Sequence, residues 1–338
     1  MKNKVLRNML IPGVVAVACI VIPALLIQVG IIEGYPAQII TLAAINAIMA
    51  ISVNMICGIT GQLSLGQAGF EALGAYAVIL FTTNCHIPLG ISIVIAGFVA
   101  AFFGFLIGFP TLKLEGDYLA IVTLAFGEII RVVLVNLKGI TGGPNGKSFS
   151  TVFTTSLDYG ASLAYLSIIG TLVLIIVLLQ NFLRSTYGRA ILSVREDEVA
   201  ANSNGISVFL YKMIGFVIAS FIAGIGGALY AALIAFVKPD LASFNNSIND
   251  LIYVVLGGMG SITGGILAAF VLTVLQESLR FLKDFRLLFY PVILIVVMLF
   301  RPQGLLGTRE LSFVKVYDGI PGFVRRLLKK DTRKQEAR

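Results

Sequence analysis

Glu128 and Arg131 are the first residues that invite a chemical interpretation, because both lie inside a long run of apolar residues. Their spacing of three residues puts both side chains on one face of a helix, where they can form an ion pair. Charged side chains within a membrane span are costly and usually functional. The sequence therefore predicts either an ion pair that faces protein or a charged pair in a transport path.

A second segment, residues 141–148, resembles the phosphate-binding P-loop G-x-x-x-x-G-K-[ST]. Thr141 replaces the first glycine of that pattern, and no strand is expected before it. We interpret the segment as a turn-rich external loop and expect no ATPase site, and so no cofactor, in this chain. The single His86 and three widely spaced cysteines predict no metal site and no disulfide framework.

The composition excludes most classes of water-soluble protein. Of the 338 residues, 58% are hydrophobic and 12% are charged, and the mean hydropathy is +0.96. Soluble domains are about 45–50% apolar and about 25% charged, so this chain lacks the charge to cover a water-facing surface. The composition argues against a soluble globular enzyme, a disordered chain and a partner of nucleic acid. It indicates an all-α polytopic membrane protein in contact with lipid.

Charge-free intervals locate the expected membrane spans, because about 20 apolar residues cross the hydrocarbon core. We expect about 8–10 transmembrane helices, near residues 8–32, 36–57, 67–84, 88–109, 117–137, 158–184, 213–237, 251–260, 264–282 and 287–300. Most of the 25 basic residues lie before residue 8, within 184–212 or after residue 300. Since cytoplasmic loops concentrate basic residues, we expect both termini and the 184–212 segment to be cytoplasmic.

Two glycine-rich segments interrupt apolar runs, GITGQLSLGQ at residues 58–67 and LGGMGSITGG at residues 256–265. Glycine at that density interrupts a helix, and an even number of crossings before the basic tail requires a break near Gly257–Gly265. Corresponding interrupted helices in two halves are typical of transporters built from structural repeats. The sequence therefore predicts two glycine-rich broken helices, with Glu71, just after the first, near the membrane interface.

Residues 184–212 form the only substantial charged stretch between spans. Asp197 is predicted to start a short exposed helix, with Ala200 and Ala201 as helix formers and Gly205 as its end. A short helix with small residues suits docking into a groove on a partner protein. The alternative is a solvated linker.

Several motifs of this chain resemble those of a known transporter family. Residues 198–205, E-V-A-A-x-x-x-G, resemble the EAA-type coupling loop of permeases of ATP-binding-cassette (ABC) importers. Further motifs, at residues 61–76, 114–131, 141–146, 188–198, 255–261 and 300–305, resemble the LivM-type permeases of branched-chain amino-acid importers. The resemblance covers about residues 35–307. Gln67 departs from a histidine expected in many relatives, and Gly265 departs from a frequent proline.

The resemblance implies an ABC importer permease with domain 1–307 in the membrane and a basic cytoplasmic tail, 308–338. It implies a homologous second permease subunit, two cytoplasmic ATP-binding subunits that use ATP, an external substrate-binding protein and a place in the bacterial inner membrane. Permeases of urea or short amides share much of the pattern and remain an alternative, and a secondary amino-acid carrier is a weaker one. The ATPase-coupling residues implied are Gly188, Arg189, Arg195, Glu196, Asp197, Glu198, Ala200, Ala201 and Gly205.

A zwitterionic amino acid needs backbone or hydroxyl partners within the membrane, which the ends of half-helices provide. We therefore place the substrate path at the two glycine-rich breaks, expected at mid-membrane. The candidate residues are Gln62, Ser64, Gln67, Gly258, Ser261 and Thr263. The alternative is that these glycines only permit close helix packing.

Overall fold

The computed structural model describes residues 35–114, 116–151, 153, 160–280, 291–292, 294–295, 298–299, 304–305 and 307. The first predicted span, much of the last one and the basic tail lie outside these residues. Five described helices are long and apolar enough to cross a membrane, and the number is six if the bent helix pair Phe244–Gly257 and Ile262–Ser278 is counted as one span. The described part of the chain therefore has the all-α fold of a multi-pass membrane protein, as predicted.

The helices alternate with short connections. The long ones are α2 (Tyr35–Val53), α3 (Gln67–Thr83), α4 (Leu89–Thr111), α5 (Asp117–Asn136), α8 (Gly160–Arg184), α11 (Val208–Ile234), α12 (Phe244–Gly257) and α13 (Ile262–Ser278). The shorter elements are η1 (Asn54–Ile59), α6 (Lys138–Thr141), η2 (Gly143–Asn145), β1 (Lys147–Ser148), α9 (Thr186–Glu196), α10 (Glu198–Ser203), β2 (Phe236–Val237) and η3 (Pro239–Ala242). The π-helical η1 continues α2 into one span of 25 residues, Tyr35–Ile59.

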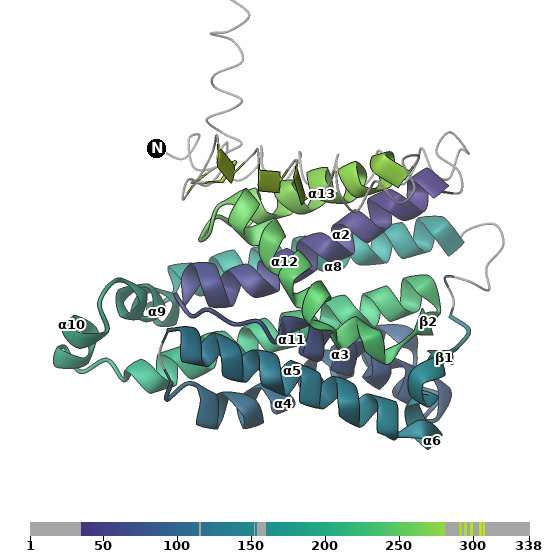
Figure 1. The fold of residues 1–338 in the computed structure, drawn as a ribbon, viewed down its shortest axis with the longest axis horizontal. Helices are drawn as coiled ribbons and strands as arrows, with labels where there is room; N and C mark the ends of the chain where they lie inside the picture. The colour runs from purple at the N-terminus through teal and green to yellow at the C-terminus, as the bar shows by residue number, and fades with distance from the viewer. Residues whose placement is uncertain are drawn as a thin grey trace, which may run out of the picture.

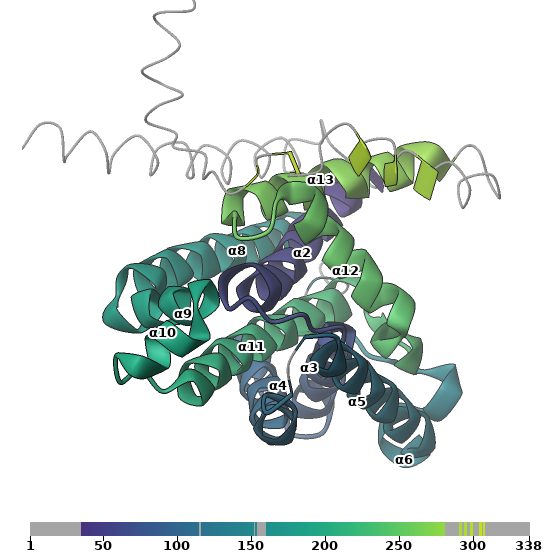
Figure 2. The same cartoon turned by 60° about the vertical axis from the view of Figure 1, so that its left-hand side comes forward.

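Helix α11 is the centre of the bundle and packs against α2, α3 and α4 (Figure 2). Small residues allow the backbones to approach closely. A Cβ atom added to Gly74 of α3 would lie 2.1 Å from the carbonyl oxygen of Gly224 in α11. Close approach through small residues is a common way for helices to associate in a membrane, where the hydrophobic effect adds little between helices.

Large apolar side chains remain exposed on α4, α5 and α8. Phe98, Phe102, Ile121 and Leu178 are each more than half exposed. A water-facing surface rarely carries so many large apolar groups, whereas a lipid-facing surface requires them. These helices therefore form the apolar outer face of the bundle.

The short sheet pairs β1 with β2 in antiparallel register, with Lys147 opposite Val237 and Ser148 opposite Phe236. It joins the loop after α5 to the end of α11. Helices α9 and α10 lie at one end of the bundle, and β1, β2 and α6 lie at the other (Figure 1). The P-loop-like segment is a turn-rich loop, as predicted, with Gly142, Gly143 and Gly146 at positive φ.

Candidate functional site

The segment between α8 and α11 folds into two helices, α9 and α10. Asp197 is the N-cap of α10, and its Oδ1 atom accepts hydrogen bonds from the backbone N–H groups of Val199 and Ala200, both at 2.9 Å. At the other end the N–H of Ile206 donates to the carbonyl of Ala201 at 3.1 Å, and Gly205 has a φ of +78°. The predicted start and end of the short helix are confirmed.

Helix α9 was not predicted, although its amphipathic sequence carries the signal. Ser185 caps it by accepting a hydrogen bond from the N–H of Gly188. Ile191 and Val194 are buried, whereas Arg195 and Glu196 are exposed. The segment is therefore a helical hairpin rather than a solvated linker. Its exposed residues include Arg189, Asp197, Glu198, Ala200 and Gly205, and the buried ones include Gly188 and Ala201.

An ion pair fixes α10 to α11. The Nζ atom of Lys212 lies 2.6 Å from Oε1 of Glu198, and the lysine side chain is only 10% exposed. Val199 in the same turn is 77% exposed. An open pocket of about 420 Å³ beside α10 is lined by Glu198, Val199, Asn202, Ser207, Val208 and Phe209. The hairpin thus presents an apolar side chain and a recess on a firmly attached helix.

The two glycine-rich segments meet at the end of the bundle that carries α9. The N–H of Gly260 donates to Oδ1 of Asn54 at 2.8 Å. A Cβ atom added to Gly61 would lie 3.0 Å from Cγ of Arg195, and one added to Gly260 would lie 3.1 Å from its Nη1 atom. Both segments therefore touch α9, and the first follows directly on the 25-residue span Tyr35–Ile59. Their place at mid-membrane stays a prediction.

The chain bends by 119° at the second segment, between α12 and α13. Ser261 caps α13, since its Oγ atom accepts a hydrogen bond from the N–H of Gly264 at 3.0 Å, and Thr263 lies 3.4 Å from the same hydroxyl. A Cβ atom added to Gly258 would lie 2.3 Å from the carbonyl oxygen of Gly307. Gly258 therefore serves close packing and Ser261 serves helix capping, which favours the structural alternative at these two positions.

The first segment takes a different course. Residues 60–66 are non-helical, and the N–H of Leu65 donates to Oγ1 of Thr123, within α5, at 3.1 Å. Gln62, Ser64 and Gln67 are each at most 4% exposed. Among the described residues, the amide groups of Gln62 and Gln67 and the hydroxyl of Ser64 have no hydrogen-bond partner. This segment thus brings three polar side chains into the bundle.

The sequence analysis did not predict that two carboxyl groups are buried together in the bundle. Glu71 of α3 and Asp250 of α12 are each 6% exposed, and their carboxyl groups interact electrostatically. Glu71 is buried among the helices of the bundle, and its expected place near the membrane interface stays a prediction. A usable signal was the i, i+4 spacing of Gln67 and Glu71, which puts two polar side chains on one helix face.

Glu128 and Arg131 form the predicted ion pair, with 2.7 Å between Oε2 and Nε, and both side chains are 34% exposed. Nη1 of Arg131 also lies 3.8 Å from Oδ1 of Asp240 in η3. The pair therefore links α5 to the connection between α11 and α12. A role of this pair in a transport path stays a prediction.

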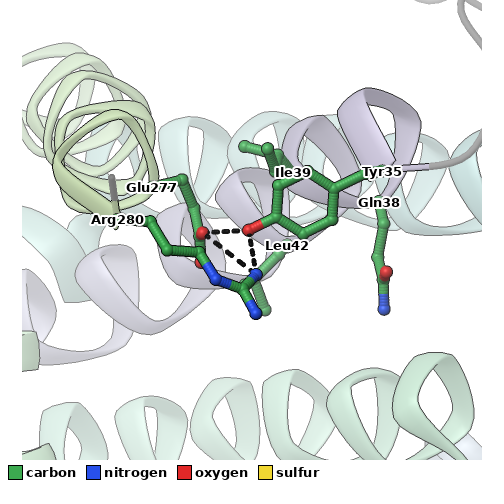
Figure 3. A pocket seen from close by; sticks show the side chains of 6 residues that line it. All are labelled: Tyr35, Gln38, Ile39, Leu42, Glu277 and Arg280. Carbon is green, nitrogen blue, oxygen red and sulfur yellow. Dashed lines mark hydrogen bonds and ion pairs between the residues drawn. The ribbon is translucent and has the colours of Figure 1, made fainter. Parts of the chain in front are cut away.

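Three polar side chains, of Tyr35, Glu277 and Arg280, join the start of α2 to the end of α13 (Figure 3). The hydroxyl of Tyr35 donates to Glu277, and Nη1 of Arg280 donates to the Tyr35 hydroxyl at 2.5 Å. The hydrogen bond with Tyr35 and the charge of Glu277 raise the pKa of Arg280. The adjoining pocket has a volume of about 410 Å³. These groups are paired with one another, so they need no ligand to be satisfied.

Comparisons with known proteins identify the family of the chain. Residues 35–300 match the family described as the permease component of branched-chain amino acid transport systems. The chain is 39% identical over 294 residues to the high-affinity branched-chain amino acid transport system permease protein LivM of Escherichia coli strain K12, covering 80% of this chain and 69% of that protein. The LivM protein of Salmonella typhimurium is 38% identical with the same coverage.

A second kind of relative is more distant. The permease protein LivH of the same Escherichia coli transport system is 25% identical over 294 residues, covering 81% of this chain and 95% of LivH. No solved structure matches the chain. The family match covers most of the chain, and the nearer relatives are well above the identity at which homology is secure. The chain belongs to the family of permease components of branched-chain amino acid transport systems.

Proposed function

We propose that this chain is the membrane-spanning permease subunit of an ABC importer that carries leucine, isoleucine and valine across the bacterial inner membrane. The family and the relatives are named for branched-chain amino acids, which supports this substrate class over urea or short amides. The observation that carries the proposal is the α9–α10 hairpin, a preformed exposed element at one end of a bundle of membrane helices.

The proposed partners follow from the chain's own features. Similarity to both LivM and LivH supports pairing with a homologous second permease. The hairpin would dock onto one of two cytoplasmic ATP-binding subunits, and an external binding protein would deliver the amino acid. In this arrangement ATP is used by the partners, the permease performs no covalent chemistry, and both termini are cytoplasmic.

The contacts of Arg195 suggest how movement of an ATP-binding subunit would be transmitted to the membrane helices. Arg195 belongs to α9 and touches the glycine-rich segments that precede α3 and α13. A displacement of the hairpin by an ATP-binding subunit would therefore reach both segments without an intervening element. Non-helical segments at the ends of helices are suited to the relative movement of helices that alternating access requires.

Reconstitution of the complete transporter in liposomes tests the proposal. The assay would combine the chain with the second permease and ATP-binding subunits encoded beside it, with ATP at their side and the binding protein at the other. We expect ATP-dependent uptake of labelled leucine, isoleucine and valine and little uptake of urea. Gradient-driven uptake by the chain alone would establish a secondary carrier, and preferred urea uptake would reject the substrate class.

A further inference from the structure

The first turns of α3 pack against α12 through polar side chains. The N–H of Ala68 donates to Oγ of Ser247 at 3.3 Å. Gln67 and Glu71 are four residues apart on α3, and Ser247 and Asp250 are three apart on α12, so each pair shares a helix face. Because Ser247 contacts the turn that contains Gln67, the faces that carry the two carboxyl groups point toward each other.

Helix α11 covers this polar cluster from a third side. A Cβ atom added to Gly227 would lie 1.9 Å from the carbonyl oxygen of Glu71. Tyr230, one turn further along α11, interacts electrostatically with Glu71. The polar cluster, defined here as Gln67, Glu71, Ser247 and Asp250, is therefore surrounded by three helices of the bundle.

The polar cluster lacks the partners that buried charges require. Within the described residues no ion pair involves Glu71 or Asp250. Oδ2 of Asp250 and both amide atoms of Gln67 have no hydrogen-bond partner there. Burying a carboxylate is costly unless a cation or hydrogen-bond donors compensate it, and an ionisable residue inside a membrane protein usually marks a functional site.

The chemistry of the polar cluster selects its ligand. Two carboxyl groups and an amide oxygen offer acceptors to a cation with several N–H donors, and an ammonium group has three donors and one positive charge. A neutral amide such as urea would bring no positive charge to the two carboxyl groups, whereas an ammonium group brings one. An ammonium group is also the one cationic part of a branched-chain amino acid, whose side chain is apolar.

We propose that Glu71 and Asp250 bind the ammonium group of the transported amino acid inside the bundle, with Gln67 as a further hydrogen-bond acceptor. This inference rests on the proposed function and names the residues that recognise the substrate in the permease itself. Ser64 precedes Gln67 by three residues, is 2% exposed and has no described partner for its hydroxyl, so it adds one more unpaired buried polar group next to this subsite in the sequence.

The variants Glu71→Gln and Asp250→Asn test the proposal in the complete reconstituted transporter. Each removes a charge and keeps the size of the side chain. We expect leucine uptake per assembled transporter to fall at least tenfold, a change equal to about 1.4 kcal/mol. Thermal stability should stay the same or rise, because an amide is cheaper to bury than a carboxylate. The matched control is Asp117→Asn, the same exchange at an exposed site in the first turn of α5, which should leave uptake within twofold.

A purely structural role gives different results. In that case the variants would lose assembly or thermal stability, while uptake per assembled transporter would match the wild type, and the proposal would be overturned. If the wild-type transporter carries no branched-chain amino acid at all, the proposed function fails before the subsite is tested. The two failures are therefore distinguishable in one assay.

A measurement on the unaltered transporter keeps the test independent of variant folding. Dicyclohexylcarbodiimide is an apolar reagent that modifies buried carboxyl groups, and mass spectrometry locates the modified peptides. We expect modification at Glu71 or Asp250 to decrease when leucine is present in excess and to be unchanged by urea. Equal modification with and without leucine would contradict the proposal.

Discussion

The α9–α10 hairpin and the polar cluster between α3 and α12 differ in whether their polar groups have partners within the protein. In the hairpin Asp197 caps a helix and Glu198 pairs with Lys212, although most of the hairpin is exposed to solvent. In the polar cluster Gln67 and Asp250 are buried, and several of their polar atoms have no partner among the described residues. The polar groups named in the exposed region have partners within the protein, whereas several of those in the buried region have none among the described residues.

This difference separates two kinds of function. An element whose polar groups are already paired keeps its shape without a ligand, which suits a docking surface that must be recognised as a rigid body. Buried polar groups without protein partners are rare in folded proteins and call for an explanation. An element of that kind suits a site that a polar ligand enters and leaves. The following predictions test whether the two regions differ in this way.

The largest effect is expected where the polar cluster depends on close backbone contact. Gly227→Ala would put a Cβ atom 1.9 Å from the carbonyl oxygen of Glu71, and backbone cannot move aside cheaply. Overpacking of this kind costs about 1–3 kcal/mol, so we expect the upper part of that range and a clear fall in the midpoint of thermal unfolding. Leucine uptake should fall with it, because Glu71 is displaced.

Gly170→Ala is the matched control for this prediction. Gly170 lies within α8, and no heavy atom lies within 4 Å of the position that its Cβ would take. Alanine favours a helix over glycine by about 1 kcal/mol, so this variant should be neutral or slightly more stable. Equal destabilisation by both variants would show that the α3–α11 contact at Glu71 is not special.

The next effect concerns the ion pair between Glu198 of the hairpin and Lys212 of α11. Removing one partner should destabilise the protein more than removing the other. Lys212 is 10% exposed and Glu198 is 45% exposed. Glu198→Gln leaves a buried positive charge without its partner and should cost about 1–3 kcal/mol. Lys212→Met leaves a carboxylate that water can solvate and should cost less than about 1 kcal/mol. Chemical unfolding of the two variants measures the difference, and equal losses would contradict the assigned burial.

The sequence was most informative where local rules determine structure. Asp197 and Gly205 were assigned correctly because capping depends on a few neighbouring residues, and the ion pair of Glu128 and Arg131 follows from helix periodicity. The helix α9 was missed because only the part of the charged stretch from Asp197 to Gly205 was predicted to be helical. Its buried face, with Ile191 and Val194, packs against α8 and α11, and these tertiary contacts are not visible in the local sequence.

The buried carboxyl groups show what sequence alone does not determine. Glu71 lies on α3 and Asp250 on α12, and they are separated by most of the chain. Whether they meet depends on the path of residues 60–66 and on the bend between α12 and α13, which are set by tertiary contacts such as that of Gly260 with Asn54. The contact of both glycine-rich segments with Arg195 of α9 was not predicted for the same reason, because it joins parts of the chain that are distant in sequence.

The smallest effect is expected at the cap of α10. Asp197→Ala removes the acceptor of two backbone N–H groups, and loss of a cap costs about 0.5–2 kcal/mol. Helix α10 has only six residues, so this loss should unfold it locally while the membrane helices stay intact. We expect ATP hydrolysis by the assembled transporter to become insensitive to leucine and its binding protein, with little change in the midpoint of global unfolding.

Two further variants define what this result means. Asp197→Asn keeps a capping oxygen and removes the charge, so it should retain most of the coupling between hydrolysis and transport. Ser243 occupies the N-cap position of α12, outside the hairpin, without a side-chain capping bond, so Ser243→Ala should change neither the coupling nor the midpoint of global unfolding. If Asp197→Asn uncouples as strongly as Asp197→Ala, the charge itself contacts the ATP-binding subunit. The hairpin would then resemble the polar cluster, because one of its polar groups would find its interaction partner in another molecule and not within this chain.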